Sequence, residues 1–201
     1  MVRRSLFWQV LLPFLALQLL ALTVLAWEAS RFLRAFYLEQ TASMLEQDAR
    51  MIEPQLRGLL GREHLAEANS LCGEMGRLLG KRVTVILPSG EVIGDSAEQP
   101  AAMDNHATRP EIADALAGRM GRSIRYSHTL QSDWIYVAVP LFESGTVAGV
   151  VRVSTSLASV NEALRRVYFR TTAASSAIAL LATVVGLILT RRIARPIRRM
   201  K

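Results

Sequence analysis

Apolar and polar positions divide the chain into two long uncharged runs and a mixed segment between them. The first run covers residues 5–27 and the second covers residues 171–190. At a rise of 1.5 Å per residue, about 20 helical residues cross the roughly 30 Å hydrocarbon core of a bilayer. The pattern therefore predicts two transmembrane helices, with residues 28–170 forming a domain between them.

A cleaved signal peptide is the alternative interpretation of the first run, because "TVLA" before Trp27 is a passable cleavage site. The apolar core of a signal peptide spans roughly 7–15 residues, which is shorter than this run. A second apolar run also follows. Both observations favour a retained transmembrane helix.

The mixed segment begins with a helical pattern in which apolar residues recur at alternating steps of four and three. Such a stripe suits a helix that packs against a second helix or covers a sheet. We expect its membrane-proximal half to face a second copy of the chain and its distal half to pack within the domain. Pro54 is expected to bend or divide the helix. The predicted dimer seam is Leu38, Ala42, Leu45, Ala49 and Ile52.

After this helix the apolar period changes from helical spacing to alternation and back. Short β-branched runs separated by Gly, Pro and Ser turns predict strands. The expected order is a helix, a two-stranded hairpin, a short helix, three strands and a final helix. The expected residues are 61–80, 82–96, 109–118, 121–129, 133–142, 146–154 and 156 onward. This order predicts an α+β domain with a five-stranded antiparallel sheet.

Charge separates the ends of the chain from its middle. The chain has 24 Lys and Arg against 17 Asp and Glu, and all of the acidic residues lie between the two apolar runs. Residues 1–4 and 191–201 hold the excess positive charge, as expected when both termini lie on the cytoplasmic side of a membrane. We find no basic patch that would indicate nucleic-acid binding. The predicted partners are the lipid bilayer and a second copy of the chain.

Three stretches of the middle segment resemble the extracytoplasmic PAS-like sensor domains called Cache domains. They are "RVTVILPSGEVIGDS", "MDNHATRPEIADALAG" and "GRSIRYSHTL…WIYVAVPL…GTVAGVVRVS". In this order and between two spans, they are similar to the sensor region of bacterial histidine kinases of the phosphate-regulon-sensor type. The resemblance implies a sensor in the inner (plasma) membrane. It also implies that the full-length parent is an ATP-dependent kinase that uses a response regulator.

The basic ending "TRRIARPIRRM" resembles the start of a HAMP linker, in which the second span continues into a short amphipathic helix. Pro196 then marks the beginning of that linker. A basic stop-transfer anchor is the alternative. Because no phosphoacceptor or ATP-binding segment is present within the 201 residues, the parent is expected to carry the output domain. A chemoreceptor, a cyclic-nucleotide synthase or a non-catalytic membrane adaptor remain alternative parents.

The loop and helix in "DNHATRPEI" carry the first group of candidate site residues. Thr108 and Glu111 have the spacing of a capping box, and they are expected to begin a helix whose first turn holds Pro110. Asn105, His106 and Arg109 lie beside that helix start and are candidates to bind a small carboxylate or phosphate. The alternative is that these three residues only satisfy loop groups or pair with acids.

Alternation along the predicted strands adds Arg125 and Tyr136, which we expect to face the same cavity. The alternative is a buried Tyr beside a paired Arg in the core. The signal need not be a small molecule, because a protein partner or the membrane itself could supply it. Cys72 is expected to be a buried small apolar side chain. His64, His106 and His128 lack metal-ligand spacing, so neither a metal site nor a cofactor nor a catalytic residue is predicted.

Overall fold

The computed structural model describes residues 6–127 and 132–197. His128, the predicted cytoplasmic residues 1–4 and the last residues of the predicted linker, 198–201, lie outside these ranges. The described residues form two compact units: residues 6–36 with 161–197, and residues 37–127 with 132–160.

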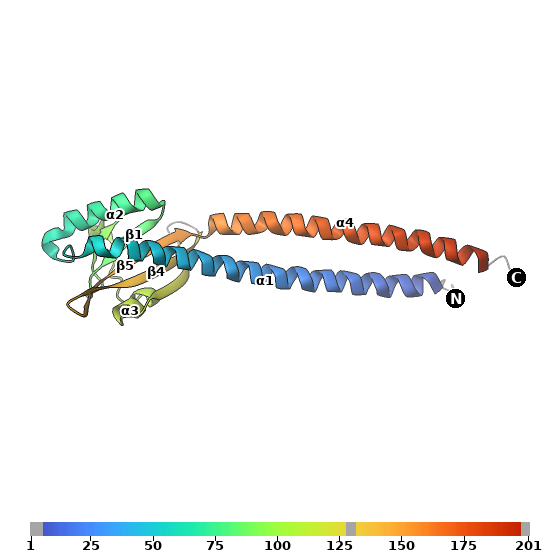
Figure 1. The fold of residues 1–201 in the computed structure, drawn as a ribbon, viewed down its shortest axis with the longest axis horizontal. Coiled ribbons are helices and arrows are strands. Elements are labelled where there is room, and N and C mark those ends of the chain that lie inside the picture. Colours follow the sequence, from blue (N-terminus) through green and yellow to red (C-terminus); the bar gives the residue numbers. More distant parts are fainter. Residues whose placement is uncertain (1–5, 128–131, 198–201) are drawn as a thin grey trace. The chain divides into compact units, whose positions relative to one another are not determined.

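The first unit consists of two long helices. Helix α1 (Leu6–Leu56) begins in it, and helix α4 (Ala158–Ile197) ends in it (Figure 1). Within this unit the Tyr168 hydroxyl donates a hydrogen bond of 3.0 Å to the Ser30 carbonyl oxygen. Among the described residues, two helical segments are long and apolar enough to cross a membrane, Pro13–Leu56 and Leu164–Gly186. The predicted linker residue Pro196 lies within α4, which ends one residue later.

The second unit is built on a five-stranded antiparallel sheet with the strand order β2-β1-β5-β4-β3. The strands are β1 (Arg82–Ile86), β2 (Val92–Asp95), β3 (Gly121–Ser127), β4 (Ser132–Glu143) and β5 (Thr146–Ser156). The helical elements are η1 (Arg62–His64), α2 (Leu65–Leu79), η2 (Pro100–Ala102) and α3 (Pro110–Leu116). The predicted α+β class and the five-stranded antiparallel sheet are confirmed.

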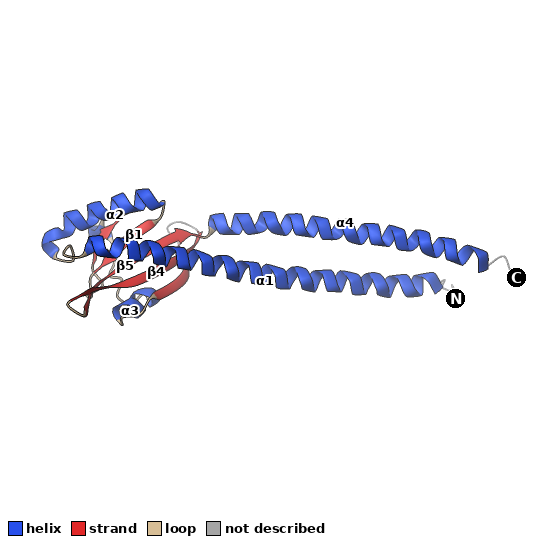
Figure 2. Ribbon diagram, in the orientation of Figure 1, coloured by secondary structure: helices blue, strands red, loops and turns tan. Residues whose placement is uncertain are grey.

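The C-terminal part of α1 and helix α2 cover one face of this sheet, and α3 lies on the other face (Figure 2). The main core lies on the α1 side. It joins Leu45 and Ile52 of α1 and Cys72 of α2 to alternate residues of the strands, among them Val137 and Val153. Cys72 is buried as predicted, and burial followed by the nearby charge of Asp95 raises the pKa of its thiol to about 12.

The predicted dimer seam is wrong for four of its five residues. Ala42, Leu45, Ala49 and Ile52 are buried in the core of their own domain, and Leu38 packs against that core. The physical reason is that an apolar sheet face of five strands needs a cover, and the apolar stripe of α1 provides one. Pro54 does not divide α1, which continues for two residues and ends at Leu56.

Two glycines place the loop and helix on the second face. Gly90 has φ +84°, and a Cβ on it would lie 2.1 Å from Asn105 Oδ1, so the hairpin between β1 and β2 can contact the loop before α3. A Cβ on Gly121 would lie 1.9 Å from the Glu111 carbonyl oxygen. The first residue of β3 therefore has to be glycine for the strand to approach α3.

Candidate functional site

The face of the sheet that points away from α1 carries polar side chains from all five strands, including Asp95 of β2. Since neighbouring residues of a strand point to opposite faces, the positions between the core residues face α3. Several of these positions are arginine, threonine, serine or tyrosine. They are Arg82 and Thr84 of β1, Arg125 of β3, Tyr136 of β4, and Arg152 and Ser154 of β5.

A cavity of about 210 Å³ lies over this polar face. It has room for about seven waters at the 30 Å³ that each occupies in the liquid, so it suits a small ligand. Its walls come from the sheet, from η2 and from the loop before α3. The lining residues are Arg82, Glu98, Ala102, Met103, Asp104, His106, Arg109, Tyr136 and Arg152.

Arg152 is the most deeply buried cation of the site, with 1 % of its surface exposed. Its Nη2 donates to Thr84 Oγ1 at 3.1 Å, and its Nη1 lies 3.6 Å from Glu111 Oε1. Nε and Nη1 are buried and have no hydrogen-bond partner among the described residues. Burial, followed by the charge of Arg109, lowers the pKa of Arg152 to about 10, so the guanidinium stays charged at neutral pH.

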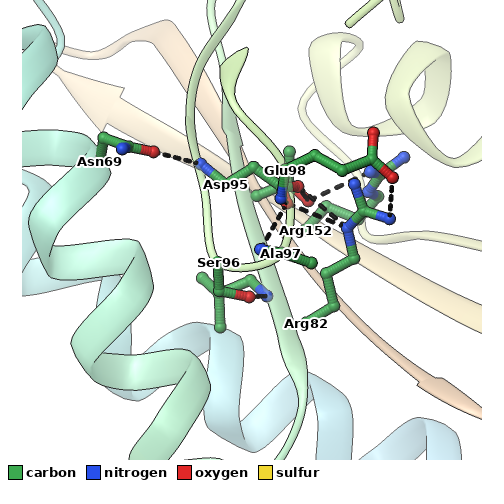
Figure 3. A network of polar contacts seen from close by, with 9 residues as sticks. Asn69, Arg82, Asp95, Ser96, Ala97, Glu98 and Arg152 are labelled. Carbon is green, nitrogen blue, oxygen red and sulfur yellow. Dashed lines mark hydrogen bonds and ion pairs between the residues drawn. The ribbon is translucent and has the colours of Figure 1, made fainter. Parts of the chain in front are cut away.

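Arg82 is held by two carboxylates (Figure 3). Its Nε lies 3.1 Å from both oxygens of Asp95, and its Nη1 lies 3.3 Å from Glu98 Oε1. Burial disfavours its charge, but the hydrogen bond and charge of Asp95 outweigh this and raise the pKa of Arg82. The positive charge of Arg82 is therefore neutralised by Asp95 and Glu98.

Asp95 also orders the chain around the cavity. It accepts hydrogen bonds from Thr84 Oγ1 at 2.7 Å and from the backbone N–H groups of Ala97 and Glu98 at 2.8 and 2.9 Å. Its own backbone N–H donates to Asn69 of α2 at 3.0 Å, as Figure 3 shows. The carboxylate thus fixes the segment that leads from β2 to η2, which forms one wall of the cavity.

Arg109 is half-buried at the cavity and has no ion-pair partner within the described residues. Burial, followed by the charge of Arg125, lowers its pKa. An arginine at its usual pKa is charged far above neutral pH, so Arg109 still presents a positive charge to the cavity. It is the cation of the site that an incoming anion can neutralise.

His106 lines the cavity and has 1 % of its surface exposed. Its Nδ1 lies 2.6 Å from the Asp104 carbonyl oxygen, which can only accept, so Nδ1 carries the hydrogen. Burial and the charges of Arg152 and Arg109 lower the pKa of His106 to about 4, which makes the ring neutral at pH 7. Its Nε2 is buried without a hydrogen-bond partner among the described residues.

Glu111 belongs to this cluster, and the predicted capping box is wrong. The residue before α3 is Arg109, which makes no side-chain capping bond, and Thr108 is exposed one residue earlier. Glu111 is fully buried, and its Oε1 accepts from Arg125 Nη2 at 2.5 Å. The turn from His106 to Arg109 delays the helix start by one residue. This delay moves Thr108 out of the capping position and turns Glu111 toward the sheet.

One other expectation for the α3 region is met by the structure. Pro110 occupies the first turn of the helix. Gly118 follows the helix end with φ +81°, and its N–H donates to the Ala115 carbonyl oxygen at 3.0 Å. Arg125 and Tyr136 face the same side of the sheet, with the guanidinium carbon 4.5 Å from the ring centroid.

The predicted ligand residues divide between the cavity and its surroundings. His106, Arg109 and Tyr136 line it, whereas Arg125 reaches it through Tyr136 and Glu111. Asn105 does not line it. The Asn105 amide donates to the Ser89 carbonyl at 2.8 Å and accepts from the Ala107 N–H at 2.9 Å, which ties the loop to the hairpin.

Sequence reasoning missed Arg82, Asp95 and Arg152. Arg152 had a visible signal, because a lone arginine stands in the apolar strand sequence "AGVVRVS". A charged residue inside such a strand is rarely buried unless it is paired or serves a site. Nothing in the local sequence identifies Asp95 and Glu98 as the partners of Arg82, since the hairpin turn brings them together.

A larger open groove of about 790 Å³ lies between α2, β2 and η2. Its lining includes Glu91 and Asp104 and contains no lysine or arginine within the described residues. It therefore offers less for an anion than the small cavity does. No group of three or more His, Cys, Asp or Glu side chains that could hold a metal occurs in the described part of the chain.

The fold is similar to several solved sensor domains. The Vibrio cholerae histidine kinase DctB sensor domain aligns with a TM-score of 0.53 at 18% identity, covering 77% of this chain and 59% of that one. The Escherichia coli DcuS sensor domain aligns with a TM-score of 0.53 at 15% identity, covering 62% and 95%. The ligand-binding domain of the Campylobacter jejuni chemoreceptor Tlp3, solved with 4-methylisoleucine, gives 0.51 at 14% identity, covering 82% and 64%.

These identities show a shared fold, and this chain spans about three fifths of the DctB and Tlp3 chains. A comparison with curated proteins found no match. The Cache fold together with an apolar helix near the N-terminus points to a membrane protein with a sensor domain. Residues 35–156 match the family model described as Single Cache-like, and the chain belongs to that family.

Proposed function

We propose that the chain is the sensor and transmembrane part of a membrane receptor, and that a small anion in the 210 Å³ cavity is its signal. The observation that supports this most is a lining arginine, Arg109, that forms no ion pair within the described residues. The charge of Glu111 acts on Arg109 without a direct ion pair, and Nε of the buried Arg152 has no hydrogen-bond partner among the described residues. A small carboxylate or phosphate would neutralise both groups through charge-assisted hydrogen bonds.

The proposed receptor crosses the membrane twice, with residues 28–170 outside the cytoplasm and both termini inside. Support comes from the two apolar helical segments and from the basic residues that flank them at the chain ends. Residues 191–201, including Pro196, would begin a HAMP linker. A histidine-kinase parent agrees with the similarity to DctB, and a chemoreceptor parent agrees equally with the similarity to Tlp3.

Connectivity suggests how the cavity would signal. Arg152 lies in β5, and α4 begins two residues after β5 ends, at Ala158. An anion that binds Arg152 more tightly in one state of the domain shifts the population toward that state. Helix shifts at interfaces are typically about 1–2 Å, and such a shift of α4 would carry the signal toward the linker.

The proposed receptor is a homodimer, and its interface has to differ from the seam first expected, because those residues are covered. The opposite side of α1 within the sensor unit exposes Met44 and Met51, with 45 % and 59 % of their surfaces accessible. Exposed methionines one helical heptad apart suit a helix–helix contact. A cysteine at Gln47, between them, should crosslink two full-length chains in membranes if this side is the interface.

Isothermal titration of the full chain in detergent with phosphate, acetate and succinate tests the proposed anion site. At least one of these anions should bind. At a concentration of a hundred times its dissociation constant, it should stabilise the domain by about 2.7 kcal/mol, which raises the midpoint of thermal unfolding by several degrees. Arg109→Ala should abolish the binding. Arg119→Ala is the matched control, because Arg119 is exposed and pairs with Asp114 outside the cavity.

Retention of full affinity in Arg109→Ala would contradict the site. If none of the anions binds the unaltered chain, the cavity is not an anion site, and the signal has to be sought among protein partners of the sensor unit.

A further inference from the structure

The hydrogen-bonding state of His106 narrows the class of ligand that the cavity accepts. The Asp104 carbonyl oxygen accepts a hydrogen bond from Nδ1–H, with 2.6 Å between the oxygen and Nδ1. This bond fixes the tautomer of the neutral ring. Nε2 is then an acceptor with a lone pair and no hydrogen. This nitrogen is buried and has no partner among the described residues, although its ring forms part of the cavity wall.

The surroundings of the ring keep it neutral. Burial and the positive charges of Arg152 and Arg109 hold the pKa of His106 at about 4, so the imidazole does not gain a second proton near neutral pH. A ligand in the cavity would therefore meet two different requirements. The arginines favour a negatively charged group, while His106 Nε2 can accept a hydrogen bond from a donor.

We infer that the ligand is a small oxyanion that carries its own hydrogen-bond donor beside the negative charge. An α-hydroxycarboxylate meets this description, and so does phosphate that keeps one P–OH group. This inference rests on the anion site proposed above and names the chemistry that the site selects. A fully deprotonated oxyanion of the same size satisfies the arginines but brings oxygen lone pairs toward the lone pair of Nε2.

The energetic basis is the cost of a buried acceptor without a donor. Nε2 is already buried without a partner among the described residues, so an anion that lacks a donor leaves it unpaired, whereas a hydroxyl group adds the missing hydrogen bond. A difference of this kind corresponds to about tenfold in affinity. The discrimination should therefore be measurable by direct titration.

Matched pairs of anions test the inference on the full chain in detergent, in a buffer at pH 7.5 without carboxylate or phosphate. Lactate and propionate differ by one hydroxyl group. Phosphate keeps a P–OH group at this pH, whereas sulfate has none. Lactate should bind about tenfold more tightly than propionate if the ligand is a hydroxycarboxylate, and phosphate about tenfold more tightly than sulfate if it is phosphate. The pair for which binding is observed shows whether the donor is the hydroxyl group of a carboxylate or the P–OH group of phosphate.

His106→Asn is the informative variant, because the asparagine amide can still donate to the Asp104 carbonyl while Nε2 is removed. Its preference for the donor-bearing anion should fall to within about twofold, with the affinity for propionate or sulfate nearly kept. His106→Gln extends an amide oxygen toward the former position of Nε2 and should restore part of the preference. His64→Asn is the control, since His64 pairs with Glu67 away from the cavity.

Equal affinities within both pairs would overturn the inference while leaving the anion site standing. A preference that survives unchanged in His106→Asn would overturn it as well, because another group would then accept the hydrogen bond. If none of the four anions binds, the proposed anion site and the inference fail together.

Discussion

The two faces of the sheet in the sensor unit are built from the same strands but filled in opposite ways. On the α1 side, apolar residues from α1, α2 and the strands form one continuous core. On the α3 side, a smaller apolar cluster around Ile112 and Val150 lies beside buried Arg152, Glu111 and His106.

The difference lies in what each face contributes to stability. Burial of apolar surface stabilises the fold by roughly 25 cal/mol per Å², so the α1 side holds the domain together. Buried charges lose their hydration, and a buried ion pair often contributes little net stability. The charges of the α3 side therefore add little net stability, and the role proposed for them is ligand recognition, which folding experiments can separate from a structural role.

The largest effect is expected on the apolar face. Ile52→Ala removes a fully buried side chain from the core and should lower the free energy of unfolding by about 4 kcal/mol. Met51→Ala, at the neighbouring exposed position, should change it by less than about 0.5 kcal/mol. Urea unfolding of both variants, followed by circular dichroism, measures this. Similar costs at the two positions would show that Ile52 does not face the core.

Breaking the charge cluster should have a somewhat smaller effect. Glu111→Gln leaves the buried Arg152 without its nearby carboxylate and should cost about 3 kcal/mol in the same assay. Glu74→Gln, on the exposed side of α2, is the control. If the α3 side serves anion recognition, saturating phosphate or lactate should recover part of the loss. An unaffected Glu111→Gln would mean that Arg152 does not depend on this carboxylate.

Acid should weaken the polar face in a defined range. The unfolded chain protonates His106 below about pH 6.5, whereas burial lowers the folded pKa to about 4. The unfolded state therefore binds more protons between these values, and stability falls as the pH falls. We expect a loss of about 2 kcal/mol between pH 7.5 and pH 5 from this residue.

The comparison with His106→Asn isolates that contribution, because the carboxylates titrate alike in both chains. The variant should lose about 2 kcal/mol less between pH 7.5 and pH 5 than the unaltered chain. Parallel losses in the two proteins would show that His106 is not held neutral by the fold.

The smallest effect concerns the start of α3. A true capping threonine replaced by alanine costs about 1 kcal/mol. Thr108 is exposed before the residue that begins the helix, so Thr108→Ala should change the free energy of unfolding by less than about 0.5 kcal/mol. A loss of about 1 kcal/mol would restore the capping role first expected for it.

Much of the fold was predictable because its signals are local. The change from helical spacing to alternation at Arg82, and the turn at Gly90, located the first hairpin, whose strands end within one residue of the prediction. Alternation along β3 and β4 also placed Arg125 and Tyr136 on one side of the sheet.

The site was predictable only in part because its members are distant in sequence. His106 and Arg109 were found from the loop, but Arg152 reaches them from β5 and Glu111 reaches Arg125 from α3. A pattern along the chain carries no information about which strand neighbours which. The strand order decides that β1 and β5 bring Arg82 and Arg152 to the same cavity.

The sequence by itself determined the apolar runs, the helix and strand types, and the stripe of α1, because these follow from the spacing of neighbouring residues. The tertiary structure alone decided that the stripe covers its own sheet, that Glu111 is a buried counter-ion, and that three strands line one cavity. The reason is that burial and pairing are properties of contacts between distant segments, and the same alternating strand can bury either apolar or charged side chains.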